Sequence, residues 1–174
     1  MLDAGGRFVL RRWELGDVEA VREAARDPYI PLITSVPPVY SEAEGAAFVR
    51  RQWDRAETGA GYSFAIADAR SGRAVGQIGL WPGANGRASV GYWVAGSARG
   101  QGVASAALLA VSAWGLDELR IPRLELHVEP WNGGSWKAAE RAGFEREGLL
   151  RSWMEVGGAR RDMYVYAKIT GTDR

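Results

Sequence analysis

At residues 99–104 the chain reads Arg99-Gly100-Gln101-Gly102-Val103-Ala104, between a predicted strand over 88–94 and a predicted helix over 103–116. The two glycines allow the backbone to turn tightly. The unpaired N–H groups of the helix N-terminus then converge, with the positive end of the helix dipole behind them. Such an arrangement binds a phosphate or pyrophosphate, and Arg99 and Ser105 can add a charge and a hydroxyl. The stretch therefore predicts a local anion site.

Two rival interpretations accompany this loop. Gly100 and Gly102 can serve only to shape a turn, and a single Gly-x-Gly pattern does not exclude that role. A dinucleotide-binding fingerprint is the other rival, but Ser105 replaces its third glycine, and antiparallel hairpins precede the loop instead of a strand-helix-strand unit. The chain also lacks a Walker phosphate-binding sequence. The loop alone thus predicts an anion site and leaves the activity open.

The hydrophobic pattern outward from the loop predicts an α+β fold. Alternating residues predict three antiparallel strands over 62–94, and the strand, helix, strand order beyond them implies a right-handed parallel crossover. Asp17 and Ser41 are the predicted N-caps of the first two helices. We expect the order β-α-α-β-β-β-α-β-α-β-β in a mixed, mostly antiparallel seven-stranded sheet with about four helices. Outside 62–94 the strands are expected over 8–13, 123–129, 149–156 and 162–169, and the helices over 17–25, 41–57, 103–116 and 136–141.

Composition and charge exclude several classes of protein. The 174 residues are 47% apolar and 25% charged and show no repeat or linker, which predicts one globular domain over 1–174. A net charge of +1 argues against nucleic-acid or anionic-membrane partners. With no cysteine and one histidine we expect no disulfide, thiolate nucleophile or metal site. The longest apolar stretch, 103–116, is too short to span a bilayer and the N-terminus lacks a signal-peptide pattern, so we expect a cytoplasmic protein.

A second group of motifs lies further along the chain. It comprises Asn132, Ser135 and Lys137, then Gly143-Phe144 and Glu147-Gly148. Together with Arg99, Gly102 and Ala104, which match the pattern Arg/Gln-x-x-Gly-x-Gly/Ala, these residues make the chain resemble the GNAT acetyltransferase superfamily. The Asn-x-x-Ser-x-Lys run, Gly91-Tyr92-Trp93-Val94 and Asp162 resemble more narrowly its RimJ/RimL branch, protein N-terminal amine acetyltransferases and their relatives. The resemblance covers nearly the whole chain, most specifically 88–169.

This resemblance implies the GNAT fold and transfer of acetyl from acetyl-CoA to an amine in a ternary complex, without a covalent acyl-enzyme. In the family, the strand before the loop and the strand after the helix splay apart, and pantetheine inserts between them. The resemblance therefore implies these cofactor-binding residues: Trp93 and Val94 by backbone pairing with pantetheine; Arg99, Gly100, Gln101, Gly102, Val103, Ala104 and Ser105 around the pyrophosphate; Asn132 and Ser135 along the cofactor arm; and Lys137 near the adenosine.

The base that such chemistry requires depends on the acceptor amine. An α-amino group with a pKa of about 7.7–8.0 loses its proton at pH 7 for roughly 1 kcal/mol, whereas a free lysine costs roughly 4–5 kcal/mol. His127 is the leading candidate base, because it lies on the strand face opposite Leu126 and its usual pKa, about 6.5, suits proton acceptance. A structural histidine is the alternative. Glu129 and Glu155 are weaker candidates, expected to be solvated charges.

The candidate acid departs from the common family pattern. Many GNAT enzymes place a tyrosine seven residues after the asparagine, but here that residue is Ala139. Ser135, one turn into the helix, is the catalytic candidate that would donate a hydrogen bond to the departing sulfur; capping of the helix is its alternative role. Met154 stands where some ribosomal-protein-modifying relatives carry an acidic residue, which argues against that particular substrate.

Acceptor recognition is expected at the loop over 29–40, which contains no acidic cluster. Trp131, Trp136 and Trp153 belong either to the core or to the wall of an acceptor pocket. We predict an N-acetyltransferase whose acceptor is a primary amine of a protein N-terminus or a small molecule. The alternatives are an antibiotic (aminoglycoside-type) acetyltransferase, which an acidic cleft would favour, and a non-catalytic acyl-CoA-binding module. Homodimers through the last strands are common in the family, and we keep a homodimer as an option.

Overall fold

Eight strands form one mixed sheet in the computed structural model, which describes residues 1–171. Their order across the sheet is β1-β2-β3-β4-β5-β6-β8-β7, and all neighbours are antiparallel except β5 and β6. The strands are β1 (Leu2–Ala4), β2 (Phe8–Arg11), β3 (Tyr62–Asp68), β4 (Ala74–Pro82), β5 (Ala88–Val94), β6 (Arg123–Val128), β7 (Glu145–Val156) and β8 (Ala159–Ile169). The parallel pair confirms the expected crossover, which runs through the helix after β5.

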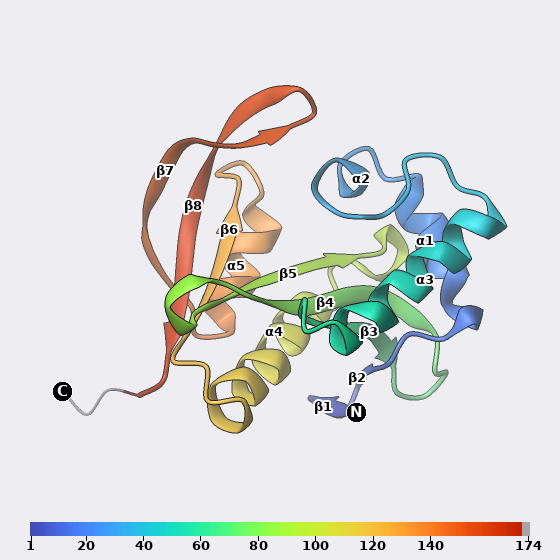
Figure 1. The fold of residues 1–174 in the computed structure, drawn as a ribbon, viewed down its shortest axis with the longest axis horizontal. Helices are drawn as coiled ribbons and strands as arrows, with labels where there is room; N and C mark the ends of the chain where they lie inside the picture. The colour runs from blue at the N-terminus through green and yellow to red at the C-terminus, as the bar shows by residue number, and fades with distance from the viewer. Residues whose placement is uncertain (172–174) are drawn as a thin grey trace.

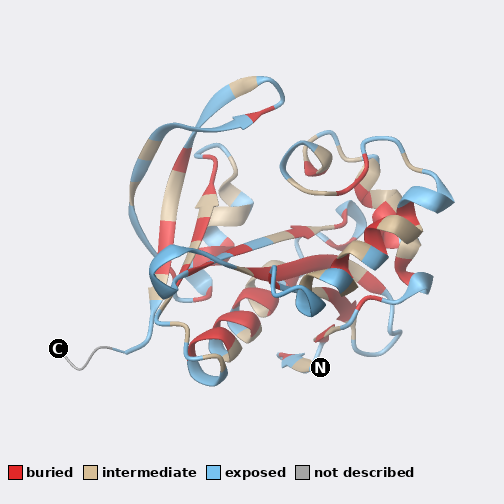
Figure 2. Cartoon of the chain, viewed as in Figure 1, coloured by how far each residue is buried: buried red, intermediate tan, exposed pale blue. Residues whose placement is uncertain are grey.

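Helices cover both faces of this sheet (Figure 1). The α-helices are α1 (Val18–Ala25), α2 (Ile30–Ile33), α3 (Glu42–Glu57), α4 (Val103–Ala113) and α5 (Gly133–Arg141). Shorter helical turns are η1 (Leu15–Asp17), η2 (Ala84–Gly86), η3 (Gly96–Ala98) and the π-helical η4 (Trp114–Glu118). Val21 of α1 and Phe48 of α3 belong to one buried cluster, whereas Leu108 of α4 and Ala139 of α5 belong to another. Figure 2 shows the buried residues along the central strands and the helix faces turned toward them.

The predicted caps of the first two long helices have different outcomes. Ser41 accepts a hydrogen bond from the backbone N–H of Glu44 at 3.1 Å, as a capping serine does. Asp17 directly precedes α1, but its carboxylate makes no cap. It accepts two hydrogen bonds from Arg11, both at 2.8 Å, and one from the backbone of Glu14. The buried acid therefore ties β2 to the start of α1.

A buried polar network fixes α3 over the sheet. The Gln77 side-chain amide donates to Gln52 Oε1 at 2.8 Å and to Ser63 Oγ at 2.7 Å. Trp93 Nε1 in turn donates to Gln77 Oε1 at 2.7 Å. Because buried polar atoms are costly without partners, this network favours one placement of α3 relative to β3, β4 and β5.

The two parallel strands separate soon after they pair. Their register includes only Ala88 with Leu124 and Ser89 with Glu125. Beyond Ser89, β5 diverges from β6, as Figure 1 shows. On its other side β5 stays paired with β4, and the N–H of Ala95 donates to Val75 at 2.9 Å. Since backbone groups alternate along a strand, those of Val94 face the gap between β5 and β6.

The observed elements follow the predicted order with a few differences. The sheet has eight strands and not seven, because Leu2–Ala4 pairs with β2; three residues are too few to show a period. The short α2 was also missed. The strand β7 begins at Glu145, earlier than predicted, because a register shift between Arg146 and Gly148 interrupts the alternation near its start. A second shift, between Leu150 and Met154, includes the positive φ of Ser152. Within residues 1–171, no helix combines the length and apolar character needed to cross a membrane.

Candidate active site

The glycine loop leads into α4 with an open backbone. Gly100 and Gly102 have φ angles of 74° and 79°, the left-handed region that favours glycine, and Gly102 is the N-cap of α4. No atom lies within 4 Å of the position that a Cβ would take at either residue. The first N–H groups of α4 have no acceptor within the helix. An anion can therefore approach this backbone closely.

Arg99 is held in place at the edge of this loop. Its Nε donates to the carbonyl of Val94 at 3.2 Å, and its Nη2 donates to Asp27 at 2.6 Å. Burial disfavours the ionised form of Asp27, but hydrogen bonds from the backbone of Ile30 and Tyr29 and from Arg99 outweigh it, so the pKa of Asp27 lies below its usual value. The loop is thus linked by a charged pair to the start of α2.

A pair of hydroxyls lies at the start of α5. Asn132 is the N-cap of α5, and its Oδ1 accepts a hydrogen bond from the backbone of Ser135 at 3.3 Å. Ser135 Oγ makes no cap; it lies 2.5 Å from the hydroxyl of Tyr92 on β5. That hydroxyl is also 3.2 Å from the carbonyl of Ser135. Burial raises the pKa of Tyr92, although the hydrogen bond to Ser135 opposes this, so the phenol is protonated at neutral pH.

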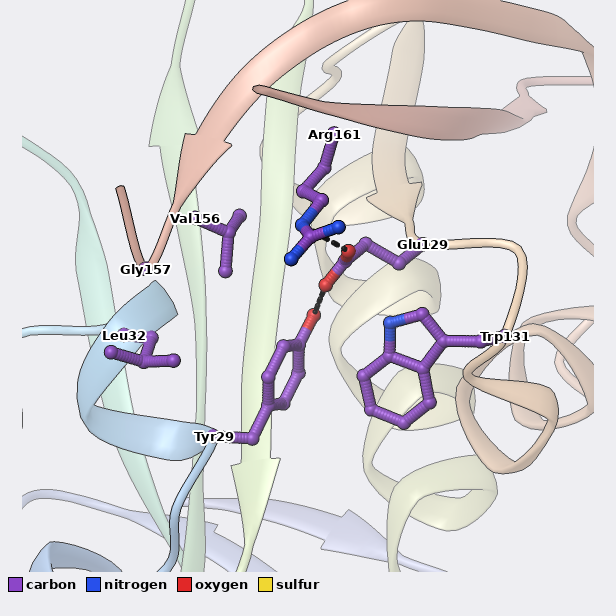
Figure 3. A pocket seen from close by; sticks show the side chains of 7 residues that line it. All are labelled: Tyr29, Leu32, Glu129, Trp131, Val156, Gly157 and Arg161. Atoms are coloured by element: carbon purple, nitrogen blue, oxygen red, sulfur yellow. Dashed lines mark hydrogen bonds and ion pairs between the residues drawn. The ribbon is translucent and has the colours of Figure 1, made fainter. Parts of the chain in front are cut away.

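A cavity of about 350 Å³ lies at the end of β6 and is called here the Glu129 cavity (Figure 3). Glu129 is only 4% exposed. One of its oxygens accepts a hydrogen bond from the Tyr29 hydroxyl at 2.5 Å, and the other lies 3.9 Å from Nε of Arg161. Burial and the neighbouring carboxylate both raise the pKa of Tyr29, which keeps it a donor. The cavity is lined by Tyr29, Leu32, Glu129, Trp131, Val156, Gly157 and Arg161.

The Glu129 cavity and the hydroxyl pair share one connection. The N–H of Asn132 donates to the carbonyl of Glu129 at 2.9 Å, which closes a tight turn between β6 and α5. A buried carboxylate and the Ser135 hydroxyl are therefore only six positions apart, at the point where β5 and β6 diverge.

Comparison with known proteins identifies the family. The family model described as an acetyltransferase (GNAT) domain matches residues 7–145. The chain belongs to the GNAT family. It is similar to an uncharacterized N-acetyltransferase, p20, of Bacillus licheniformis, with 28% identity over 163 residues that cover 92% of each chain. It is also similar to a probable N-acetyltransferase, YjcK, of Bacillus subtilis, with 32% identity over 69% of this chain and 68% of that one.

The fold comparison agrees with this assignment. The structure of Mycobacterium smegmatis RimJ in complex with CoA-disulfide has a TM-score of 0.81 and 29% identity, covering 97% of this chain and 84% of that chain. These matches confirm the expected GNAT fold, the RimJ/RimL-like branch and the enzyme class, an acyltransferase that uses acetyl-CoA as co-substrate.

The sequence-predicted GNAT cofactor residues occupy different environments. The backbone groups of Val94 face the gap, whereas those of Trp93 face β4, so the backbone pairing expected for Trp93 is not available there. The Trp93 indole lies in the core and donates to Gln77 on β4. Val103 is buried, and Ala104 and Ser105 are half-buried in the first turn of α4. Gln101 is held by a hydrogen bond from Arg7 at 2.5 Å. Lys137 is exposed, with its Nζ 5.3 Å from the ring centre of Trp136.

These features fit a CoA-type group. The loop offers an open cradle at Gly100 and Gly102, and the gap offers the backbone N–H of Val94, whose carbonyl already accepts from Arg99. In addition, Nε1 of Trp136 is buried and has no hydrogen-bond partner among the described residues. Trp136, directly after Ser135, therefore has an N–H that can donate a hydrogen bond to a ligand.

His127 lies outside the cavity. It is half-buried on β6, and its ring stacks on Trp153 with centres 5.7 Å apart and planes at 24°. Burial lowers the pKa of His127, Glu125 opposes the shift and Arg87 adds to it, so the imidazole is neutral at pH 7.

The sequence did not predict the roles of some residues of the site. Glu129 was expected to be a solvated charge, which is wrong, because the β7–β8 hairpin and Tyr29 cover it. From the sequence, Tyr92 was named only as part of a motif. Alternation along the strand could have placed it, because Trp93 faces α3 and the adjacent Tyr92 must then face α5. Of the three clustered tryptophans, only Trp131 lines the Glu129 cavity.

Proposed function

We propose that this GNAT enzyme transfers an acetyl group to a primary amine by direct attack in a ternary complex. One observation carries the proposal: the turn after β6 joins a cavity with a buried carboxylate, Glu129, to a hydroxyl pair, Ser135 and Tyr92, beside the gap between β5 and β6. An acceptor in the Glu129 cavity and an acyl donor in the gap can thus meet at the turn after β6.

The residues around the gap would hold acetyl-CoA. The backbone of Arg99 to Ala104 is suited to the pyrophosphate, since its N–H groups and the α4 dipole favour a negative charge. The backbone of Val94 is suited to the pantetheine arm, with Asn132 near its acyl end and the exposed Lys137 near the adenosine. Acetyl-CoA supplies the acyl carbon to which the amine nitrogen bonds and the thiol that leaves as the carbon–sulfur bond breaks.

Glu129 would hold the acceptor amine. Its carboxylate accepts hydrogen bonds from the nitrogen and takes the proton that the nitrogen loses when its bond to the acyl carbon forms. An α-amino group reaches the neutral state at pH 7 for roughly 1 kcal/mol, so Glu129 needs little basicity to serve it. His127 is the rival base from sequence reasoning. Comparing Glu129→Gln with His127→Gln separates the two: we expect kcat to fall about 100-fold in the first and less than threefold in the second.

Ser135 and Tyr92 would protonate the leaving sulfur together. A serine that gave up its proton alone would be left as a strongly basic alkoxide. A phenol with a usual pKa near 10 is much closer to a thiol near 8.5. When the Tyr92 hydroxyl turns from the Ser135 carbonyl to donate to Ser135 Oγ, the serine hydroxyl would be free to donate its own proton to the sulfur. This pair would take the role of the tyrosine that many GNAT enzymes carry at the position of Ala139.

The alternatives predict different behaviour in one experiment. We would measure acetyl-CoA binding calorimetrically and follow release of free thiol with N-terminal peptides, amino acids, polyamines and aminoglycosides. Acceptor-dependent thiol release supports the enzyme, and CoA binding with no release on any amine supports the non-catalytic module. Turnover restricted to aminoglycosides would support the antibiotic-modifying alternative, which the cavity does not favour, because Arg161 balances Glu129 there. Absence of CoA binding would refute the assignment of Arg99 to Ala104.

A further inference from the structure

The buried carboxylate of the Glu129 cavity has capacity for one more cation. A carboxylate offers about four lone-pair positions. The hydroxyl of Tyr29 uses one of them, and Arg161 lies 3.9 Å away, beyond hydrogen-bond distance. Because Glu129 is buried, the remaining positions favour a donor that also carries charge. A single ammonium group meets that requirement.

Two arginines line the cavities that include this carboxylate. A second cavity of about 400 Å³ shares Glu129, Trp131 and Arg161 with the first, and adds Pro130, Arg160 and Asp162. Arg161 donates no hydrogen bond to any residue among 1–171, and 53% of its side chain is exposed. Asp162, by contrast, already accepts a hydrogen bond from the backbone of Ser152 at 2.7 Å. The guanidinium groups are therefore available to a carboxylate or phosphate, which they bind in bidentate fashion.

The charges that line the two cavities are balanced. One carboxylate and one guanidinium line the first, and two of each line the second. A polyamine or aminoglycoside would bring several positive charges to a surface with no excess of negative charge. A molecule that carries one amine and one anionic group would instead match both Glu129 and Arg161.

We infer that this site selects amines that carry their own anionic group close to the reacting nitrogen, the chemistry of an amino acid or of a protein N-terminus followed by acidic residues. The inference rests on the proposed function and names its substrate class. The amine would lie at Glu129 and the anionic group at Arg161 and Arg160. Trp131, 64% exposed, and the Tyr29 ring, 4.9 Å from it, supply an apolar wall beside Glu129 (Figure 3).

The β7–β8 hairpin and α2 meet at one side of the cavity. Gly157 at the tip of the β7–β8 hairpin approaches Leu32 of α2: a Cβ at Gly157 would lie 3.3 Å from Leu32 Cδ1. Figure 3 shows these two residues at the side of the cavity opposite Trp131. Leu32 and Gly157 thus form one side of the cavity, and Trp131, with the exposed Arg161, borders the rest.

The test compares amine acceptors of different charge. We would measure kcat/KM by thiol release for the C-terminally amidated peptides Ala-Glu-Glu, Ala-Gln-Gln and Ala-Lys-Lys. Free glutamate and spermidine would show whether the acceptor is a peptide or a small molecule. We expect the acidic peptide to exceed the neutral one by about tenfold and the lysine peptide to fall below both. In Arg161→Gln the acidic preference should shrink to within about twofold, and in Arg161→Glu it should reverse. Arg151→Gln, an exposed change on β7 outside the cavity, should retain it.

The outcomes separate this inference from the proposed function. Equal rates for the three peptides, a preference for the lysine peptide or spermidine, or an unchanged preference in Arg161→Gln would overturn the inference while leaving the acetyltransferase intact. Silence with every amine would contradict the proposed function. In that case calorimetric binding of the same peptides to the CoA complex still tests the charge preference, and tighter binding of the lysine peptide would refute it.

Discussion

Replacing Tyr92 with Phe removes a single oxygen from the proposed proton path. In the structure that oxygen lies 2.5 Å from Ser135 Oγ. The hydrogen bond contributes about 0.5–1.5 kcal/mol to stability, so Tm should fall by only about 1–6 °C in a protein of this size. The effect on rate should be much larger, because a positioned acid contributes about 100-fold or more. We expect kcat on the preferred amine to fall about 100-fold, with KM for acetyl-CoA within about threefold of the wild type.

A double-mutant cycle makes the prediction sharper. If Tyr92 and Ser135 act as one proton path, Ser135→Ala costs about as much as Tyr92→Phe, and the double variant costs no more than either. Independent roles would multiply to about 10,000-fold, and the difference corresponds to a coupling free energy of about 2.7 kcal/mol. Thiol release under saturating acetyl-CoA measures all three variants, and small general-acid buffers should partly restore Tyr92→Phe.

The matched control is Tyr62→Phe, since the exposed Tyr62 packs edge-on against Trp114 and its hydroxyl bonds to no residue in the described part of the chain. A Tyr92→Phe enzyme with kcat within twofold of that control would refute the proton path. So would a double variant whose loss is the product of the two single losses.

Four further changes have expected outcomes. Arg99→Gln should weaken acetyl-CoA binding by about tenfold in calorimetry; unchanged affinity would remove Arg99 from the anion site. Gly102→Ala forces a left-handed φ on alanine and should cost about 1–2 kcal/mol in urea unfolding, together with CoA affinity; an unaffected protein would contradict the strained turn. Gln77→Leu leaves Trp93 Nε1 without its acceptor and should cost about 1–3 kcal/mol, whereas equal stability would show that water replaces the amide. Because burial lowers the pKa of His127, the unfolded chain binds more protons below about pH 6.5 and stability falls there; in His127→Gln the loss of Tm from pH 7.5 to 5.5 should be smaller, and an equal loss would argue against the shift.

Local patterns were sufficient to predict most of the fold. The apolar run of α4, the alternation of β6 and the capping serine of α3 each express a period or a cap that a short window contains. The elements that were missed are those with little local pattern. β1 has three residues, α2 has four, and the bulge near Ser152 changes the period of β7 within one strand.

The candidate site was harder to predict because it depends on contacts between distant segments. The glycine loop and Ser135 are recognisable as motifs, but Glu129 and Tyr29 meet across a sequence separation of 100 residues, and Arg161 comes from the last hairpin. Nothing in the neighbourhood of Glu129 signals burial, since alternation along β6 places it on the same face as His127 and Glu125. The charge balance of the cavity is likewise a property of the folded chain alone.

The gap between β5 and β6 has a consequence for solubility. An unpaired strand edge is a template on which a foreign strand can add, and proteins usually shorten or cover such edges against aggregation. Here the exposed edge of β5 begins after Ser89 and ends at Val94, whose carbonyl already accepts a hydrogen bond from Arg99. Tyr92 spans the opening to α5. The gap proposed for the pantetheine arm is thus too short and too obstructed for edge-to-edge association with another chain.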